Sequence, residues 1–289
     1  MKRKLTAVVV GATGKQGGAV ARSLLERGHE VRAVTRNPGS VKAKALANAG
    51  ATLVTASLED TAVLTNALDG ATSFFAVTTP AGGTDSETRQ GVSAADAANA
   101  AGVHLVFSSV GSADRRTGIP HFDSKYAVEQ HIAKIGVRAT ILAPVYFMEN
   151  LYFASEQLAT GIYAVPLPPT KKLAQVAVAD IGAVAVRVFE DESRFAGRRF
   201  DLASDELTGN DVVAILLRVT GRAFAYSQVP LDLVRERWGE DRAKMYEWFD
   251  RVGYTVDLTA LRRDFPDVAF HDFESWAKAQ DWKALLQGR

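Results

Sequence analysis

The sequence of 289 residues contains no cysteine. This absence excludes a disulfide framework, a zinc–thiolate site and a thiol-based redox switch. Histidine is also scarce, and the five histidines show no spacing typical of metal ligands. No metal site is therefore expected.

The sequence also lacks an excess of one charge and a long apolar run. Its formal net charge is only +1, so it shows no electrostatic signature of direct binding to nucleic acid or to a membrane surface. No segment approaches the length of a transmembrane helix. The start, MKRKLTAVVVGATG, is basic and then apolar, but its apolar run is too short for a signal peptide. We expect a soluble, cytoplasmic monomer or homodimer.

Low-complexity linkers are absent too, and the only repeat is an alternation of strand-like and helix-like segments. Apolar, β-branched runs predict strands, and the amphipathic segments between them end at glycines, which favour helix termination. Because parallel strands need crossover helices, this order predicts an α/β protein with a Rossmann-like, doubly wound parallel sheet. The predicted strands are Leu5–Val10, Glu30–Thr35, Ala51–Ala56, Ser73–Val77, His104–Ser109 and Ala139–Ala143.

The pattern changes after Pro144. We expect residues 1–150 to form the main domain and residues 151–289 a smaller, mostly helical domain. A helix over Ile181–Glu190, with Asp180 as its N-cap, is expected to return to the main domain. In the smaller domain, Thr208 followed by Asp211 predicts another helix start, and the aromatic tail carries tryptophans that we expect to act as packing anchors.

A glycine-rich stretch, VVVGATGKQGGAV, follows the first predicted strand and precedes an amphipathic helix. In that context, backbone amides and a helix N-terminus can hold a pyrophosphate, so Gly11, Gly14 and Gly17 predict a dinucleotide site. The alternative is a tight turn that binds nothing. The second strand ends in AVTRNP, where Arg36 replaces the acidic residue that accepts a ribose 2′-hydroxyl in NAD-binding proteins. A guanidinium can pair with a 2′-phosphate, which favours NADP(H), unless Arg36 is only a solvated surface residue.

The stretches GATGKQGGAV, VTRNP, HFDSK and PVYFMEN together resemble the NmrA-like proteins, which are atypical members of the short-chain dehydrogenase/reductase superfamily. The resemblance implies a Rossmann-like domain that binds NADP(H) and a small substrate domain. Members of that family include NADP(H)-binding regulators that bind protein partners and NADPH-dependent quinone reductases. The resemblance therefore points to the cofactor more strongly than to the activity.

The resemblance also implies residues that contact the cofactor. Those of the pyrophosphate loop are Gly11, Thr13, Gly14, Lys15, Gln16 and Gly17. Those for the 2′-phosphate, the adenine and the cofactor ribose are Arg36, Ser57, Leu58, Thr78, Thr79 and Pro80. Those farther along the chain are Arg89, Ser108, Lys125, Tyr146, Phe147, Glu149 and Asn150. Ligands of open α/β sheets bind at the carboxyl ends of the strands, and these stretches follow a predicted strand or face that edge.

The stretch HFDSKYA departs from the superfamily pattern, which places a catalytic tyrosine four residues before the lysine. Here His121 takes that place and Lys125 is kept. Histidine can do acid–base chemistry near neutral pH, but a neighbouring ammonium opposes its protonated form. Lys125 and His121 are the catalytic candidates. Two hypotheses stay open: an NADPH-dependent reductase of quinone-like or conjugated carbonyl compounds, or a non-catalytic NADP(H) sensor that regulates a protein partner.

Overall fold

The computed structural model describes residues 4–287, and the chain divides into two compact units. The first, which we call the sheet unit, contains the chain up to residue 116, residues 120–143 and residues 181–201. The second unit contains residues 117–119, 144–180 and the chain from residue 202 onward. The sheet unit therefore includes residues 181–201, although the preceding residues 144–180 belong to the second unit.

Within residues 4–287, seven strands form the sheet of the sheet unit, in the order β10-β6-β5-β4-β1-β2-β3. Neighbours from β6 to β3 pair in parallel, and the backbone bonds from Ile141 to Arg198 and from Val145 to Leu202 give β10 the same direction beside β6. The predicted doubly wound parallel sheet is confirmed. The strands are β1 (Thr6–Val9), β2 (Glu30–Thr35), β3 (Thr52–Thr55), β4 (Ser73–Val77), β5 (His104–Ser108), β6 (Ala139–Pro144) and β10 (Arg199–Leu202).

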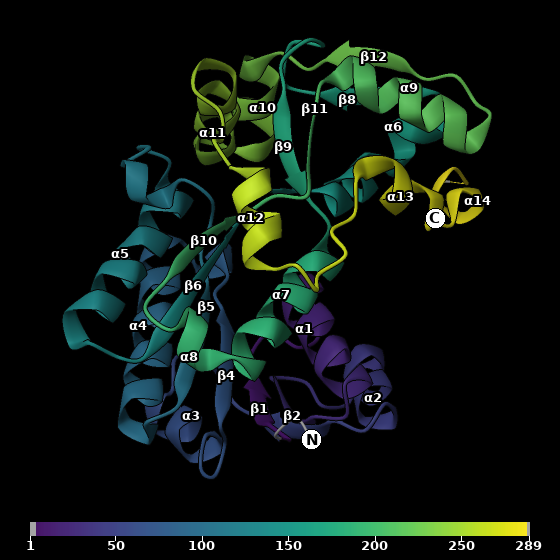
Figure 1. Ribbon diagram of the computed structural model, residues 1–289. Coiled ribbons are helices and arrows are strands. Elements are labelled where there is room, and N and C mark those ends of the chain that lie inside the picture. Colours follow the sequence, from purple (N-terminus) through teal and green to yellow (C-terminus); the bar gives the residue numbers. More distant parts are fainter. Residues whose placement is uncertain (1–3, 288–289) are drawn as a thin grey trace. The chain divides into compact units, whose positions relative to one another are not determined.

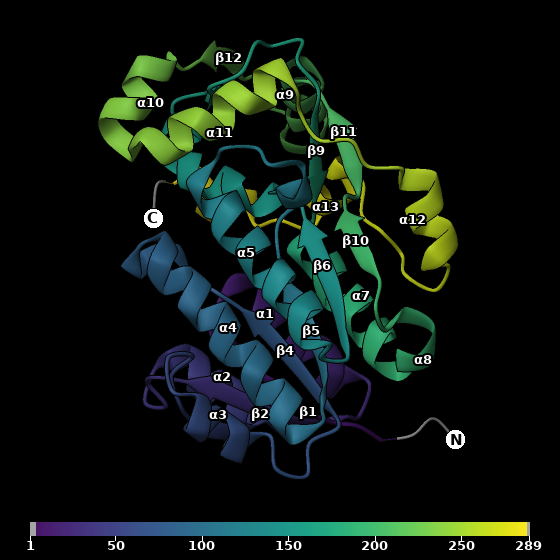
Figure 2. The ribbon, with the colours of Figure 1, turned by 90° about the vertical axis from the view of Figure 1, so that its left-hand side faces the viewer.

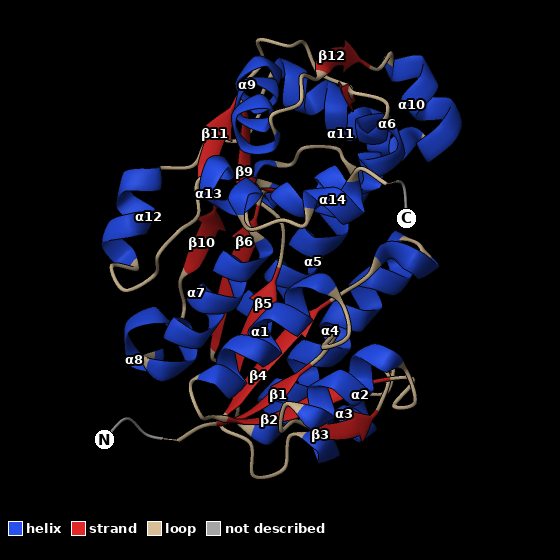
Figure 3. Ribbon diagram, turned by 90° about the vertical axis from the view of Figure 1, so that its right-hand side faces the viewer, coloured by secondary structure: helices blue, strands red, loops and turns tan. Residues whose placement is uncertain are grey.

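Helices cover both faces of this sheet. α4 (Thr84–Ala101) and α5 (Pro120–Ile135) lie together over one face (Figure 2), whereas α1 (Lys15–Glu26) and α7 (Val178–Glu190) lie over the other (Figure 3). The remaining helices of this unit are α2 (Val41–Asn48), α3 (Thr61–Ala67) and α8 (Glu192–Phe195). Burial of apolar surface against both faces is the main source of stability in such a sheet.

The core of the sheet unit shows why these helices pack so closely. Phe74 and Phe107, from neighbouring strands, are fully buried against alanines of α4 and Val128 of α5. A Cβ on Gly91 of α4 would lie 2.3 Å from a methyl group of Val128, so only glycine fits at this contact. The close contact fixes α5, and with it the lysine that α5 carries, against α4.

The second unit contains more strands than the sequence predicted. β9 (Leu173–Val176) pairs with β11 (Asp205–Leu207) and β7 (Tyr146–Phe147), while β8 (Ile162–Val165) pairs in parallel with β12 (Ala225–Gln228). β9 is buried along its whole length and β12 is mostly exposed, so neither shows the alternation of apolar and polar residues that predicts a half-buried strand. The other elements, labelled in Figure 1, are the 3-10 helix η3 (Met148–Ala154) and the helices α6 (Ser155–Ala159), α9 (Gly209–Thr220), α10 (Leu231–Trp238), α11 (Glu240–Arg251), α12 (Leu258–Asp264), α13 (Phe273–Lys278) and α14 (Trp282–Leu285).

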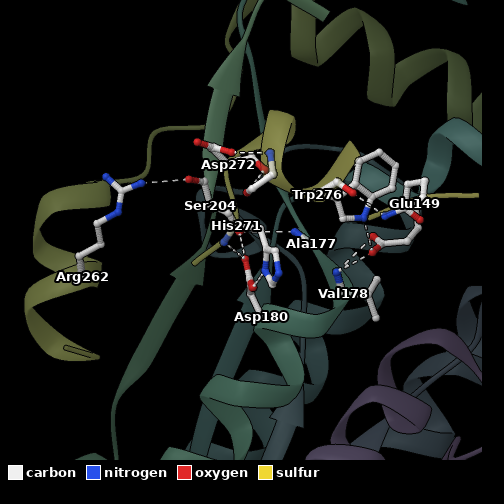
Figure 4. Close-up of polar contacts among 11 residues, drawn as sticks. Glu149, Ala177, Val178, Asp180, Ser204, Arg262, His271, Asp272 and Trp276 are labelled. Atoms are coloured by element: carbon white, nitrogen blue, oxygen red, sulfur yellow. Dashed lines mark hydrogen bonds and ion pairs between the residues drawn. The ribbon is translucent and has the colours of Figure 1, made fainter. Parts of the chain in front are cut away.

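The start of α7 differs from the prediction. The helix begins at Val178, so Asp180 lies within its first turn and is not its N-cap. The buried Asp180 carboxylate instead accepts hydrogen bonds from the Ser204 hydroxyl and from the backbone N–H of His271, and it contacts the His271 ring (Figure 4). Asp180 therefore holds two distant segments of the second unit together.

The tryptophans were predicted to be packing anchors, and this prediction is wrong for one of them. Trp276 is 4% exposed and packs on Phe273, whereas Trp238 is 48% exposed at the end of α10. Trp248 and Trp282 are half-buried. The other helix start predicted for the smaller domain is confirmed, since Thr208 and Asp211 form a reciprocal capping box at the start of α9.

Candidate functional site

The glycine loop between β1 and α1 admits no side chain at two of its positions. Gly11 has a φ of 67°, which favours glycine, and a Cβ there would also lie 2.7 Å from the side chain of Val77. A Cβ on Gly17 would lie 2.4 Å from the carbonyl oxygen of Gly11. The N-cap of α1 is Gly14, which has no side chain that could bond to the first N–H groups of the helix. The loop is therefore tight, and the N-terminus of α1 is suited to an anion.

The end of β2 carries the cation predicted to recognise a 2′-phosphate. Thr35 is buried, and its hydroxyl accepts a hydrogen bond from the N–H of Asn37 at 3.1 Å. Arg36 is exposed, and its guanidinium has no hydrogen bond or ion pair to any residue in the range 4–287. An ordered turn thus presents a guanidinium that is free to pair with an anion.

The ends of β3 and β4 carry the next predicted residues. The hydroxyl of Ser57 accepts the N–H of Glu59 at 3.3 Å, while Leu58 packs against the apolar core. Thr79 donates its N–H to Gln90 of α4 at 3.2 Å. Pro80 begins a short 3-10 turn, and Arg89 is exposed on α4. The loop after β4 is therefore bound to α4 by its backbone.

Lys125 of α5 and Thr78 at the end of β4 come together around a buried carboxylate. The Lys125 Nζ donates to the Thr78 hydroxyl at 2.8 Å and lies 3.0 Å from Oε1 of Glu87. Thr78 donates to the same Oε1 at 3.0 Å, and the hydroxyl of Ser124 lies 2.8 Å from Oε2. The Glu87 side chain is fully buried, whereas that of Lys125 is 12% exposed.

An ammonium has three N–H donors, and two of those on Lys125 have acceptors in this cluster. No acceptor for the third exists within residues 4–287. Two contacts, one to Thr78 and one to Glu87, thus hold the Lys125 ammonium at the carboxyl edge of the sheet.

Sequence reasoning missed Glu87. In the sequence, Glu87 is one of several polar residues in TDSETRQG, which marks an ordinary helix start. An acidic residue in the first turn stabilises a helix by complementing its dipole, whether or not it has a side-chain partner, so its presence there does not indicate an ion pair. Only the packing of α4 on α5 shows that this carboxylate faces Lys125. Ser124, inside the motif HFDSKYA, was missed for the same reason.

The end of β5 contributes two serines with different partners. The Ser108 hydroxyl donates to the side-chain oxygen of Gln16 at 2.6 Å and so joins β5 to the first turn of α1. Ser109 donates to Glu129 of α5, whose other carboxylate oxygen accepts from Arg199 at 2.9 Å. Burial raises the pKa of Glu129, and the Arg199 charge opposes that shift. Both hydroxyls therefore bond within the sheet unit.

The loop after these serines is strained. Ser112 and Arg116 have φ values of 61° and 53°, a region that residues with a side chain rarely adopt. Arg199 of β10 donates to the carbonyl of Val110 at 3.2 Å and pairs with Asp201, which lies 3.4 Å from the N–H of Ser112. Strained backbone of this kind gathers at functional sites and persists where surrounding bonds hold it.

His121 lies in the first turn of α5, directly after Pro120. Its ring packs edge-on against Phe122 with ring centroids 4.8 Å apart, and it is half-buried. Its carbonyl lies 3.1 Å from the Ser124 hydroxyl. His121 and Lys125 therefore lie on one helix with the predicted spacing, and Lys125 is the one whose side chain joins the cluster around Glu87.

The predicted residues Tyr146, Phe147, Glu149 and Asn150 belong to the second unit. Burial raises the pKa of Tyr146, whose hydroxyl lies 3.4 Å from that of Tyr246. The carboxylate of Glu149 accepts the backbone N–H of Val178 at 3.1 Å and the indole N–H of Trp276 at 3.0 Å, as Figure 4 shows. Glu149 therefore caps the start of α7.

Two kinds of feature are absent from residues 4–287. These residues contain no group of three or more histidine or acidic side chains that could hold a metal ion. No helix in the same range is long and apolar enough to cross a membrane.

Known proteins resemble this chain along most of its length. Quinone oxidoreductase 2 of Escherichia coli (strain K12) is 30% identical over 227 residues, which cover 76% of this chain and 77% of that protein. The solved structure of an NADPH-dependent quinone oxidoreductase from the same species, complexed with NADPH, matches with a TM-score of 0.79 at 25% identity, covering 94% of this chain and 98% of that one.

The structure of NmrA, a negative transcriptional regulator, in complex with NADP matches with a TM-score of 0.77 at 21% identity. The match covers 97% of this chain and 100% of that one, and at this identity it shows the fold alone. The model of the NmrA-like family matches residues 3–277. This match confirms the resemblance seen in the sequence: the chain belongs to the NmrA-like family.

Proposed function

We propose that this chain binds NADP(H) at the carboxyl edge of the parallel sheet. The residues present fit that cofactor in three places. A Cβ on Gly17 would collide with the backbone of Gly11, so glycine at this position lets the N-terminus of α1 pack closely on the loop, where the N–H groups of the helix start can face a pyrophosphate. Arg36 offers an unpaired guanidinium to a 2′-phosphate. Lys125 offers its third N–H to a ribose hydroxyl.

We further propose that the protein is an NADPH-dependent reductase of quinone-like or conjugated carbonyl compounds. The observation that carries this proposal is the fixed ammonium of Lys125, held by Thr78 and Glu87 with one donor left over. Such a donor orients a bound ribose without taking part in proton transfer. The likeness to a quinone oxidoreductase over most of the chain supports the same substrate class.

The missing tyrosine restricts the chemistry. A bound reduced nicotinamide supplies a hydride, and a quinone that takes the hydride and one proton becomes a hydroquinone. The product oxygen of a quinone needs little acid assistance, so water or His121 suffices as the proton source. A simple ketone gives a far more basic alkoxide and needs a strong, well-placed acid. Position 121 thus favours quinones over ketones as substrates.

Steady-state kinetics test this proposal. NADPH consumption is measured at 340 nm with a panel of quinones, enones and simple ketones, after NADPH binding has been established by fluorescence titration. We expect the fastest turnover with quinones, slower turnover with enones and none with simple ketones. A protein that binds NADPH and consumes it with no member of the panel is not a reductase of this class.

A second function is favoured by one observation, which is the histidine in place of the catalytic tyrosine. A protein that binds NADP(H) without turnover acts as a sensor only if its two cofactor forms differ in affinity, because equal affinity shifts no equilibrium. Dissociation constants for NADP⁺ and NADPH decide this point. Equal dissociation constants for NADP⁺ and NADPH remove the sensor hypothesis.

A further inference from the structure

We propose that Glu87 is the positioning residue that sets the relative affinity of this protein for NADP⁺ and NADPH. The inference rests on the proposed NADP(H) site. It concerns the charge beside that site, and it assigns a role to a residue that the sequence motifs leave out.

The geometry makes Glu87 the centre of the cluster. One carboxylate oxygen receives both the Lys125 ammonium, at 3.0 Å, and the Thr78 hydroxyl, at 3.0 Å. The other oxygen receives the Ser124 hydroxyl at 2.8 Å. Both oxygens are thus bonded to groups at the carboxyl edge of the sheet, and the carboxylate determines where the lysine donor lies.

Because Glu87 is buried, its charge can influence the binding of a charged cofactor. Its side chain is fully buried and that of Lys125 is 12% exposed, so the solvent screens this ion pair much less than it screens surface pairs. Together the two side chains carry no net charge. An oxidised nicotinamide ring bears a positive charge that the reduced ring lacks. A neutral Glu87–Lys125 pair therefore lets both forms bind, whereas an uncompensated ammonium disfavours the oxidised one.

Another acidic residue on α4 provides the matched control. Asp85 lies in the same first turn of α4, but it is exposed and its carboxylate has no hydrogen bond or ion pair within residues 4–287. Changing Asp85 to asparagine removes one negative charge from the helix start without touching Lys125. Solvent screening should make its effect on cofactor preference negligible.

The experiment measures dissociation constants for NADP⁺ and NADPH, by isothermal titration calorimetry at fixed pH and salt, for the wild-type protein and three variants. Glu87→Gln keeps the shape of the side chain and leaves the ammonium uncompensated. We expect the ratio of the NADP⁺ constant to the NADPH constant to rise on the order of fivefold or more, the scale of typical coupling between charged sites. Asp85→Asn should leave the ratio at the wild-type value.

Lys125→Met leaves the opposite charge at the site, because the Glu87 carboxylate then lacks its cation. The affinity for both cofactors should fall, but the ratio of the NADP⁺ constant to the NADPH constant should also fall, because the remaining negative charge favours the oxidised ring. If Glu87→Gln alone fails to fold, the double variant Lys125→Met/Glu87→Gln decides the proposal, because it differs from Lys125→Met only in the charge of Glu87. Equal ratios in these two variants would overturn the proposal. A purely structural role of Glu87 would weaken both cofactors equally and leave the ratio unchanged, which would overturn the proposal. Failure of the wild-type protein to bind either cofactor would instead refute the proposed function.

Discussion

The ammonium nitrogen of Lys125 lies 3.0 Å from the fully buried carboxylate of Glu87. This ion pair joins α5 to α4 at the carboxyl edge of the sheet. The two residues are 38 positions apart, as follows from their numbers, and no local pattern relates them. Their contact fixes the position of the Lys125 ammonium, and we expect a change of charge at either residue to alter cofactor binding.

The first prediction concerns the stability of this pair. Lys125→Met leaves a buried carboxylate without its cation, which should lower the free energy of unfolding by about 3 kcal/mol. The double variant Lys125→Met/Glu87→Gln removes both charges and should recover most of that loss. Urea unfolding followed by circular dichroism measures both values. A double variant as unstable as the single one would show that the pair contributes through packing alone.

The second prediction concerns the glycine loop. A Cβ on Gly17 would lie 2.4 Å from the carbonyl oxygen of Gly11, whereas one on Gly14 would lie 3.1 Å from the same oxygen. Gly17→Ala should therefore distort the loop and abolish cofactor binding, and Gly14→Ala should weaken binding only partly. Fluorescence titration with NADPH ranks the two variants. Wild-type affinity for NADPH in Gly17→Ala would contradict this role of the loop.

The third prediction concerns cofactor preference at the end of β2. Arg36→Ala removes the unpaired guanidinium and should weaken NADPH binding by about tenfold or more while leaving NADH binding almost unchanged. Arg237→Ala, at an exposed position of α10 without an ion pair within residues 4–287, is the control. The measurement is the dissociation constant for each cofactor. A wild-type protein that binds NADH and NADPH equally would contradict the assignment of Arg36.

The fourth prediction concerns acid stability. Burial by itself would raise the pKa of Glu190, but hydrogen bonds from Arg27 and Arg187 outweigh it and lower that pKa to about 2. A carboxyl group whose pKa is lower in the folded state stabilises the fold above its unfolded pKa of 4.5. That stability is lost as the pH falls from about 4.5 to about 2.

Glu190→Gln should therefore lower the free energy of unfolding at pH 7 by about 2 kcal/mol and flatten its decline between about pH 4.5 and about pH 2. Glu26→Gln, an exposed position on α1 without an ion pair within residues 4–287, should change neither. Urea unfolding at a series of pH values provides the comparison. If the free energy of unfolding of the Glu190 variant declines at low pH as steeply as that of the wild type, other carboxyl groups dominate the acid sensitivity.

The strands of the main sheet were readable from the sequence because their signals are local. Buried parallel strands are continuous apolar runs, and the glycines after the helices mark where each helix ends. For example, Glu30–Thr35 and Ser73–Val77 have the predicted bounds. The short strands of the second unit gave no such signal. Asp180 was predicted to be an N-cap because its residue type favours that role, and tertiary contacts with Ser204 and His271 place it differently.

By itself, the sequence determined the fold class and the family, because both depend on residue types at fixed spacings along the chain. The same spacings single out Gly17, Arg36 and Lys125 as candidates, and their roles await the experiments above. Only the tertiary structure decided that Lys125 is held by Glu87 and Thr78, and that Ser108 bonds to Gln16. The physical reason is that such contacts form between segments distant in sequence, where a polar residue signals nothing until folding buries it beside its partner.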